Sequence, residues 1–343
     1  MDDKVGFKRI ACEEAFITQD LTRALWDLVE NDPPDDPGFI SMWRGIGSTR
    51  RFMDRMQDLG EGRLRDMDSV GVDMQLLLLT APGVQVFDAP TGTALARSCN
   101  DELAEACRRH PDRLAGLAAI APQDPDAAAR ELERGMRTLG LKGAVVNSHT
   151  RGEYLDDPGY WPIFEAAEAL DAPIYIHPTP PPAPVIGPYL SRGLEGPLAG
   201  FAAEVYLHTL AIITSGALDR FPKLKLVLGH LGEGLPYFAY RLDYMQHHAA
   251  RSGLRGRREG TKLKRKISDY LRGNLYVTTS GMAWAPAILF AREVLGADHV
   301  LYAMDYPYQF DKAEVETTDA LEISDADKKM LYQTNAEKLF SLN

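Results

Sequence analysis

The chain has 343 residues, of which 45% are hydrophobic and 25% charged, and its formal net charge is −11. These values are typical of a globular protein with a sizeable core, and the length favours a single domain spanning residues 1–343. The acidic charge argues against nucleic acid and anionic membranes as partners, although residues 251–266 are locally basic.

Short apolar runs recur along the chain, and most are followed by a segment with the apolar spacing of a helix. Runs of this kind are typical of parallel strands that are buried on both faces. Eight of them alternating with helices predict an α/β fold, a (β/α)8 TIM barrel. The runs are Arg9–Cys12, Met74–Leu79, Leu114–Ile120, Gly143–Val146, Ile174–Ile176, Leu224–Leu228, Leu275–Thr278 and Val300–Ala303.

The predicted helices lie between or after these runs. Where start and stop residues are present they support the assignment, as at Asp124-Pro125 and Gly140. The predicted helices are Thr91–His110, Asp126–Thr138, Trp161–Leu170, Leu207–Asp219, Leu235–His248, Lys262–Leu271, Ala285–Val294 and Asp325–Leu339.

Two segments interrupt the alternation. Asn31–Gly60 is an insertion after the first strand, and Pro178–Gly200 is a Pro/Gly-rich loop after the fifth. Long connections of this kind are often lids or binding loops, so we expect both at the C-terminal mouth of the barrel.

The odd number of cysteines and the absence of a CxxC motif argue against a disulfide framework or a zinc ribbon. The first eight residues are polar and charged rather than a signal peptide, and no apolar run is long enough to span a bilayer. We therefore expect a cytoplasmic protein.

Polar residues directly follow several predicted strands. Glu13 follows the first strand, His177 the fifth, His230 the sixth and Asp305 the eighth. The C-terminal ends of barrel strands converge on one face, where active sites of this fold lie. Each residue taken singly has an ordinary structural explanation, such as a cap or an ion pair. The set of them predicts one shared site, to which His149, after the fourth strand, is a weaker candidate.

Carboxylates and imidazoles at one site suit a divalent metal such as Zn²⁺, Mn²⁺ or Fe²⁺. Two carboxylates and one imidazole would leave coordination positions open for water or substrate. The remaining histidine could then act in acid–base catalysis, because its ordinary pKa is near neutral.

The motifs around these residues resemble the decarboxylase branch of the amidohydrolase superfamily. They are EEAF at Glu13, IHP at His177, GHLGE at His230 and MDYP at Asp305, and GLKGAVVNSHT and RLDYM extend the likeness over nearly the whole chain. That branch includes aminocarboxymuconate-semialdehyde, γ-resorcylate and 2,3-dihydroxybenzoate decarboxylases. EEAF, NSHT, RLDYM and AMDYPYQ resemble its carboxyvanillate-type members in particular.

One position departs from the superfamily pattern in an informative way. Many members carry a metal-binding histidine two residues after the first ligand, where this chain has Ala15. The carboxyvanillate-type members are similar in lacking it. The resemblance therefore implies Glu13, His177 and Asp305 as metal ligands, with Mn²⁺ as the metal and Zn²⁺ as the alternative.

The resemblance also implies a reaction, the non-oxidative decarboxylation of an ortho-hydroxy aromatic carboxylate. The expected substrate is 5-carboxyvanillate, giving vanillate and CO2, or a related benzoate such as γ-resorcylate or 2,3-dihydroxybenzoate. Asp305 would donate the proton, with His230 beside it and Glu233 orienting His230.

Substrate contacts are expected from Arg51, which we favour over Arg50, and from Tyr308 and Thr80. Arg241 matches an arginine that reaches a neighbouring subunit's site in this family, which implies a homodimer or homotetramer. Arg63 we expect to be structural.

Two alternatives remain open at this point. One is a metal-dependent hydrolase of a lactone or amide from the same superfamily, against which Ala15 argues. The other is a barrel that binds an aromatic acid without catalysis, and the complete set of acidic and histidine residues argues against it.

Overall fold

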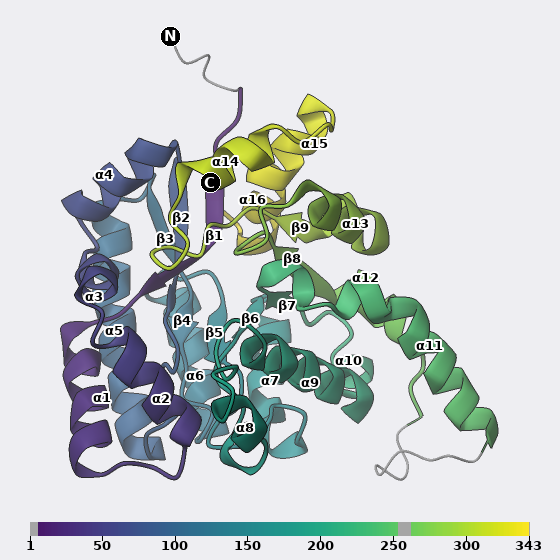
Figure 1. Ribbon diagram of the computed structural model, residues 1–343, viewed down its shortest axis with the longest axis horizontal. Coiled ribbons are helices and arrows are strands. Elements are labelled where there is room, and N and C mark those ends of the chain that lie inside the picture. The colour runs from purple at the N-terminus through teal and green to yellow at the C-terminus, as the bar shows by residue number, and fades with distance from the viewer. Residues whose placement is uncertain (1–5, 253–261, 343) are drawn as a thin grey trace.

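Nine short parallel strands form the centre of the computed structural model, which describes residues 6–252 and 262–342 (Figure 1). They pair in chain order, as one sheet of three strands and another of six. Their bounds are β1 (Ile10–Phe16), β2 (Met74–Leu79), β3 (Leu114–Gly116), β4 (Ala118–Ala119), β5 (Ala144–Asn147), β6 (Ile174–His177), β7 (Leu226–Leu228), β8 (Leu275–Thr278) and β9 (Val300–Leu301).

Backbone hydrogen bonds join the two sheets into a closed barrel. At the first junction β3 and β4 form one strand interrupted at Leu117, whose N–H donates to Leu77 O at 2.8 Å. At the second, β1 pairs with the segment after β9, through Cys12 N to Tyr302 O (2.9 Å) and Ala15 N to Tyr306 O (2.7 Å). The fold is the predicted (β/α)8 barrel, with β3 and β4 together as its third strand.

Helices fill the connections between strands, and none in the described part of the chain is long and apolar enough to cross a membrane. The connection from β1 to β2 contains α1 (Gln19–Asn31), α2 (Pro37–Ile46), α3 (Arg50–Gln57) and α4 (Glu61–Val70). The others are α5 (Ala89–Arg109), α6 (Pro125–Arg137), α7 (Trp161–Ala169), α8 (Ala183–Leu190), α9 (Gly200–Ser215), α10 (Ala217–Arg220), α11 (Leu235–Ser252), α12 (Ile267–Asn274), α13 (Ala285–Leu295), α14 (Lys312–Asp319), α15 (Asp325–Lys329) and α16 (Asn335–Phe340).

Several boundaries differ from the sequence prediction for local reasons. The first strand continues past Cys12 to Phe16, and all seven of its residues are buried. The helix predicted from Lys262 begins at Ile267, because the N–H of Lys266 is capped by Asp269 Oδ2 at 3.2 Å. Most of the basic stretch at residues 251–266 lies outside the described residues. The helices α1, α2, α3, α4, α8 and α14 were not predicted.

The two long connections contact each other on one side of the barrel. Gly38 of α2 lies so close to α8 that a Cβ atom there would be 2.3 Å from Ile186 Cδ1. Ser41, also on α2, donates to Glu195 Oε1 at 2.9 Å. The insertion after β1 and the Pro/Gly-rich loop after β6 therefore pack as one unit (Figure 1).

The strand β4 depends on a buried side chain from α5. Asn100 Nδ2 donates to Ala119 O at 2.9 Å, and its Oδ1 accepts from Ala119 N at 2.8 Å. Replacing Asn100 by Ala leaves both backbone groups without a partner, so we expect a loss of about 3 kcal/mol in the free energy of unfolding. Urea unfolding followed by circular dichroism measures it. Asn31→Ala, at an exposed position, should cost less than about 0.5 kcal/mol; equal losses would contradict the assignment.

Candidate active site

The polar residues predicted to share a site lie together at the C-terminal ends of the barrel strands. Glu13 Oε1 is 3.8 Å from His177 Nε2, and His230 Nε2 is 3.8 Å from Asp305 Oδ2. The charge of Glu13 also acts on the pKa of both His230 and Asp305. The fold thus brings together side chains from four separate strand ends.

Glu13 lies within β1 rather than after it, at a point where the pairing of β1 with β2 shifts register. Its carboxylate is buried, and Oε2 accepts from the hydroxyls of Thr278 (2.6 Å) and Ser280. Its Oε1 accepts no hydrogen bond from any described residue. Thr278 and Ser280 were not predicted as site residues. The indication in the sequence was the polar run Thr278-Thr279-Ser280 at the end of β8.

His177, the last residue of β6, supplies a neutral imidazole. Burial lowers its pKa to about 4, although the negative charge of Glu13 opposes this shift. Its Nδ1 is buried and has no hydrogen-bond partner among the described residues. A neutral imidazole is the form that binds a metal.

His230 begins the short 3-10 helix η2 (His230–Gly232) in a left-handed backbone conformation, with φ of 51°. Leu231 and Glu233 are also left-handed, and non-glycine residues adopt this region only where the surrounding structure enforces it. The turn brings Glu233 Oε1 to 2.6 Å from His230 Nδ1. Burial alone would lower the pKa of His230, but the charges of Glu13 and Glu233 raise it well above its usual value. The carboxylates around His230 therefore stabilise its protonated form.

Asp305 lies four residues beyond β9 and is also left-handed, with φ of 67°. Burial raises the pKa of its carboxyl to about 6, although the facing His230 opposes the shift.

The chemistry of the site fits a divalent cation. Glu13 Oε1 is a buried acceptor that no described residue binds by a hydrogen bond, and Nε2 of the neutral His177 lies 3.8 Å from it. Burying such an oxygen is costly unless something binds it. A Cβ at Gly229 would be 2.5 Å from Glu13 Oε1, so only glycine leaves this oxygen accessible from that side. Among residues 6–252 and 262–342, however, no three acidic, histidine or cysteine side chains converge closely enough to hold an ion as they stand.

Three of the four residues expected to contact the substrate are connected to one another. Thr80 and Tyr308 are linked, with 2.6 Å between their hydroxyl oxygens, and Tyr308 N donates to Asp305 O at 2.8 Å. The ring of Tyr308 packs against that of Phe52, with centroids 5.2 Å apart. The guanidinium of Arg51 lies over the Phe52 ring, 5.5 Å from its centroid. Thr80, Tyr308 and Arg51 thus form a chain of contacts that begins beside Asp305.

Arg241 has no hydrogen bond or ion pair to Glu13, His177, His230 or Asp305 among the contacts of the described residues. It is exposed on α11, which extends away from the barrel (Figure 1), and its charge acts on Tyr206 of α9.

The remaining candidates have structural partners. Arg50 pairs with Asp54 at 3.3 Å. Arg63 is fully buried and donates to the carbonyls of Asp58 and Ala15. His149 makes local contacts, with Nε2 3.0 Å from Pro180 O.

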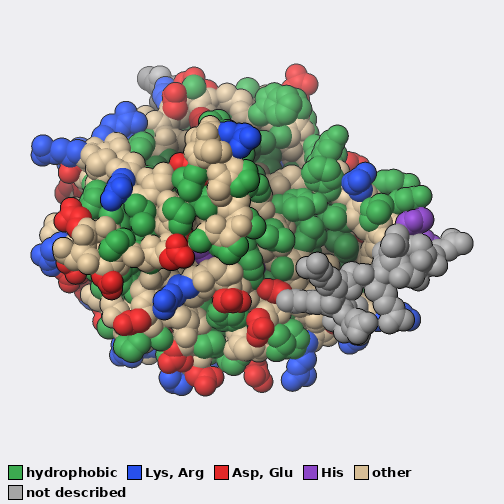
Figure 2. Space-filling model, turned by 60° about the horizontal axis from the view of Figure 1, so that its bottom comes forward, with side chains coloured by type: hydrophobic (Ala, Val, Ile, Leu, Met, Phe, Trp, Pro, Cys, Tyr) green, Lys and Arg blue, Asp and Glu red, His purple; other side chains and the backbone are tan. Residues whose placement is uncertain are grey.

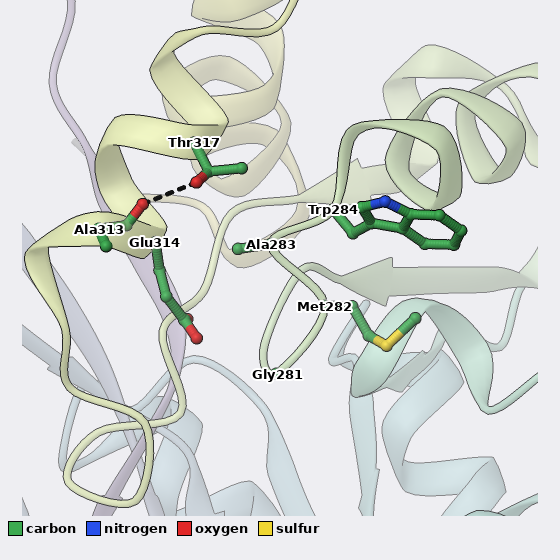
Figure 3. A pocket seen from close by; sticks show the side chains of 7 residues that line it. All are labelled: Gly281, Met282, Ala283, Trp284, Ala313, Glu314 and Thr317. Carbon is green, nitrogen blue, oxygen red and sulfur yellow. Dashed lines mark hydrogen bonds between the residues drawn. The ribbon is translucent and has the colours of Figure 1, made fainter.

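A pocket of about 340 Å³ opens beside the site, between α14 and the loop after β8 (Figure 3). Its wall includes Gly281, whose Cβ would be 3.1 Å from His230 Cδ2. Figure 3 shows Glu314 pointing from α14 into the space between helix and loop. Gly281 therefore borders both the pocket and His230.

Comparisons with known proteins agree on one family. The amidohydrolase family model matches residues 51–342. The chain is 36% identical to γ-resorcylate decarboxylase of Polaromonas sp. strain JS666, over 98% of this chain and 99% of the relative.

Solved structures give the same result. One is 5-carboxyvanillate decarboxylase of Novosphingobium aromaticivorans, with manganese and 4-hydroxy-3-methoxy-5-nitrobenzoic acid, at 45% identity and a TM-score of 0.95 over 99% of this chain and 97% of that one. Another is dihydroxybenzoic acid decarboxylase of Polaromonas sp. JS666, with manganese and 2-nitroresorcinol, at 35% identity and a TM-score of 0.83 over 98% of each chain. With its barrel and its mouth of acidic and histidine residues, the chain belongs to the amidohydrolase family, in the branch that contains these decarboxylases.

Proposed function

We propose that the chain, as one catalytic domain, is a metal-dependent carboxy-lyase that decarboxylates an ortho-hydroxy aromatic carboxylate, with 5-carboxyvanillate as the first candidate and γ-resorcylate or 2,3-dihydroxybenzoate as related ones. The observation that carries the proposal is the buried Glu13 Oε1, which accepts no hydrogen bond from a described residue and lies beside a neutral His177. The manganese in the related structures supports Mn²⁺ as the metal, with Zn²⁺ as the alternative. The decarboxylase names of the relatives favour this reaction over hydrolysis of a lactone or amide.

Glu13, His177 and Asp305 would hold the ion. When bound, it would supply positive charge that favours the phenolate form of the substrate. The phenolate can push electrons into the ring, so that the carbon bearing the carboxylate becomes basic.

Asp305 is the group that we place as proton donor to this carbon. When the proton is transferred, the ring loses aromaticity. The bond to the carboxylate then breaks, its electron pair returns to the ring, and CO2 leaves. His230, protonated and held by Glu233, lies 3.8 Å from Asp305 and would balance the charge that Asp305 gains.

An Asp305→Asn variant, which cannot deliver this proton, should lose at least about 100-fold in kcat. Steady-state kinetics of the variant measures this loss.

We also infer that Thr80, Tyr308 and Arg51 bind the oxygens of the substrate. The hydroxyls of Thr80 and Tyr308 form one hydrogen-bonding pair, and Arg51 is linked to them through Phe52. A guanidinium binds a carboxylate with two parallel hydrogen bonds, which suits a substrate that carries a second carboxylate.

A second copy of the chain is the expected partner, in a homodimer or a homotetramer built from it. Large apolar side chains are exposed on α11 and near α13, among them Tyr240 (81% exposed), Tyr237 (75%) and Trp284 (62%) (Figure 2). Contiguous apolar surface of this kind supports contact with another chain. Arg241 is on the same helix, so a copy that covers Tyr240 would also receive Arg241. The cytoplasm is the expected location of this assembly.

The proposed reaction is tested with a panel of ortho-hydroxybenzoates. The protein is stripped of metal with a chelator, and ultraviolet absorbance and CO2 release are followed before and after Mn²⁺ is added. We expect turnover of 5-carboxyvanillate or a related benzoate that depends on the metal. Acid release from a lactone or amide, without CO2 from any benzoate, would instead support the hydrolase alternative.

The shared site is tested by mixing two variants. Asp305→Asn is expected to be inactive because it removes the proton donor from the subunit's own site. Arg241→Ala is expected to have a raised KM because each site then lacks the arginine that the neighbouring subunit supplies. After subunits are exchanged at a 1:1 ratio, a dimer would contain one complete site in half of its molecules. Wild-type-like KM should therefore return in about one quarter of all sites. Steady-state kinetics measures this, and no recovery after exchange, demonstrated by native mass spectrometry, would contradict Arg241 acting across an interface.

A further inference from the structure

Glu14, the residue after the proposed ligand Glu13, reaches the segment that carries Asp305. Its carboxylate is completely buried. Oε1 accepts from the backbone N–H of Met304 at 2.9 Å, and Oε2 accepts from that of Tyr306 at 3.0 Å. The two carboxylate oxygens thus bind the amides on either side of Asp305.

The Asp305 segment requires such support. Asp305 is left-handed, a conformation that a non-glycine residue keeps only when its surroundings impose it. The backbone bonds between β1 and this segment are at its two ends, from Cys12 N to Tyr302 O and from Ala15 N to Tyr306 O. Between these bonds, the side chain of Glu14 supplies the acceptors for the amides of Met304 and Tyr306.

A second layer of buried polar groups holds Glu14 in turn. Gln75 Nε2 is 3.5 Å from Glu14 Oε2, and Gln75 Oε1 accepts from Arg63 Nη1 at 3.0 Å. Arg63 also donates to Ala15 O at 2.8 Å, and its guanidinium lies 4.6 Å from the ring centroid of Tyr306. The same arginine therefore contacts both β1 and the segment that follows β9.

We propose that Glu14 is a positioning residue, which fixes the left-handed turn at Asp305 and so aims the Asp305 carboxylate at the metal. The inference rests on the proposed function, because it takes Asp305 as a metal ligand. Residues that orient metal ligands through hydrogen bonds commonly change metal affinity about 10- to 100-fold when they are replaced.

The test compares Glu14→Gln with a matched control, Glu131→Gln. A glutamine at position 14 has one acceptor oxygen for the N–H groups of Met304 and Tyr306. Its NH2 group would face the second N–H, so that two donors would oppose each other without a hydrogen bond. Glu131 is also a buried carboxylate, but it lies on α6 and accepts from Asn100 (2.7 Å) and Arg134 (2.8 Å), away from the site. Mn²⁺ affinity is measured by electron paramagnetic resonance of the free ion, and Tm by calorimetry on metal-free protein.

We expect Glu14→Gln to weaken Mn²⁺ binding about 10- to 100-fold, and Glu131→Gln to lower Tm without changing the Mn²⁺ affinity. Equal affinity in wild type and Glu14→Gln would overturn the role of Glu14 and leave the proposed function standing. A wild-type protein that binds no Mn²⁺ would instead contradict the metal site itself.

A second measurement needs no variant. In metal-free wild-type protein labelled with ¹⁵N-Met and ¹⁵N-Tyr, the amides of Met304 and Tyr306 should exchange with D2O at least about 100 times more slowly than exposed amides. Exchange at the rate of exposed amides would overturn the proposal, even if Glu14→Gln does not fold.

Discussion

The buried carboxylate of Glu13 is the constraint on which the rest of the site depends. A negative charge away from water is costly unless hydrogen bonds or opposite charges compensate it. Here the hydroxyls of Thr278 and Ser280 bind one oxygen, while the other, Oε1, faces a neutral His177 and has no described partner. The nearby imidazolium of His230 supplies only one positive charge, which Glu233 and Asp305 share. A divalent cation would relieve this excess of negative charge, and the manganese in related structures supports this account.

The barrel explains how such a cluster forms from residues far apart in the chain. Parallel strands deliver their C-terminal ends to one face, and left-handed turns at His230 and Asp305 then turn the chain back at once, so that both side chains remain at that face. The backbone bonds between β1 and the segment after β9 bring Glu13 and Asp305 onto adjacent segments. The backbone bonds that close the barrel at this junction therefore also bring these two site residues together.

Much of this arrangement could be predicted from the sequence, because strands buried on both faces appear as short apolar runs and their ends mark the mouth. The runs Met74–Leu79 and Leu275–Thr278 agree with β2 and β8 residue for residue. Individual hydrogen bonds between residues distant in sequence could not be predicted. The hydroxyl of Ser280 meets Glu13 across 267 positions, and Glu14 binds the amides of Met304 and Tyr306 across about as many. The register shift inside β1, which places Glu13 within the strand, likewise has no local sequence mark. The role of Arg241 depends on a second copy and so is beyond what one chain can display.

The central claim is that a proton replaces the carboxylate on the ring. The most direct measurement is a reaction of Mn²⁺-loaded protein with 5-carboxyvanillate in D2O, followed by proton NMR together with trapping of the released CO2. The account predicts one deuterium at the ring carbon that loses the carboxylate, in equal amount with CO2, and no reaction after the metal is removed. Product without deuterium at that carbon, or turnover that is unchanged without metal, would contradict it.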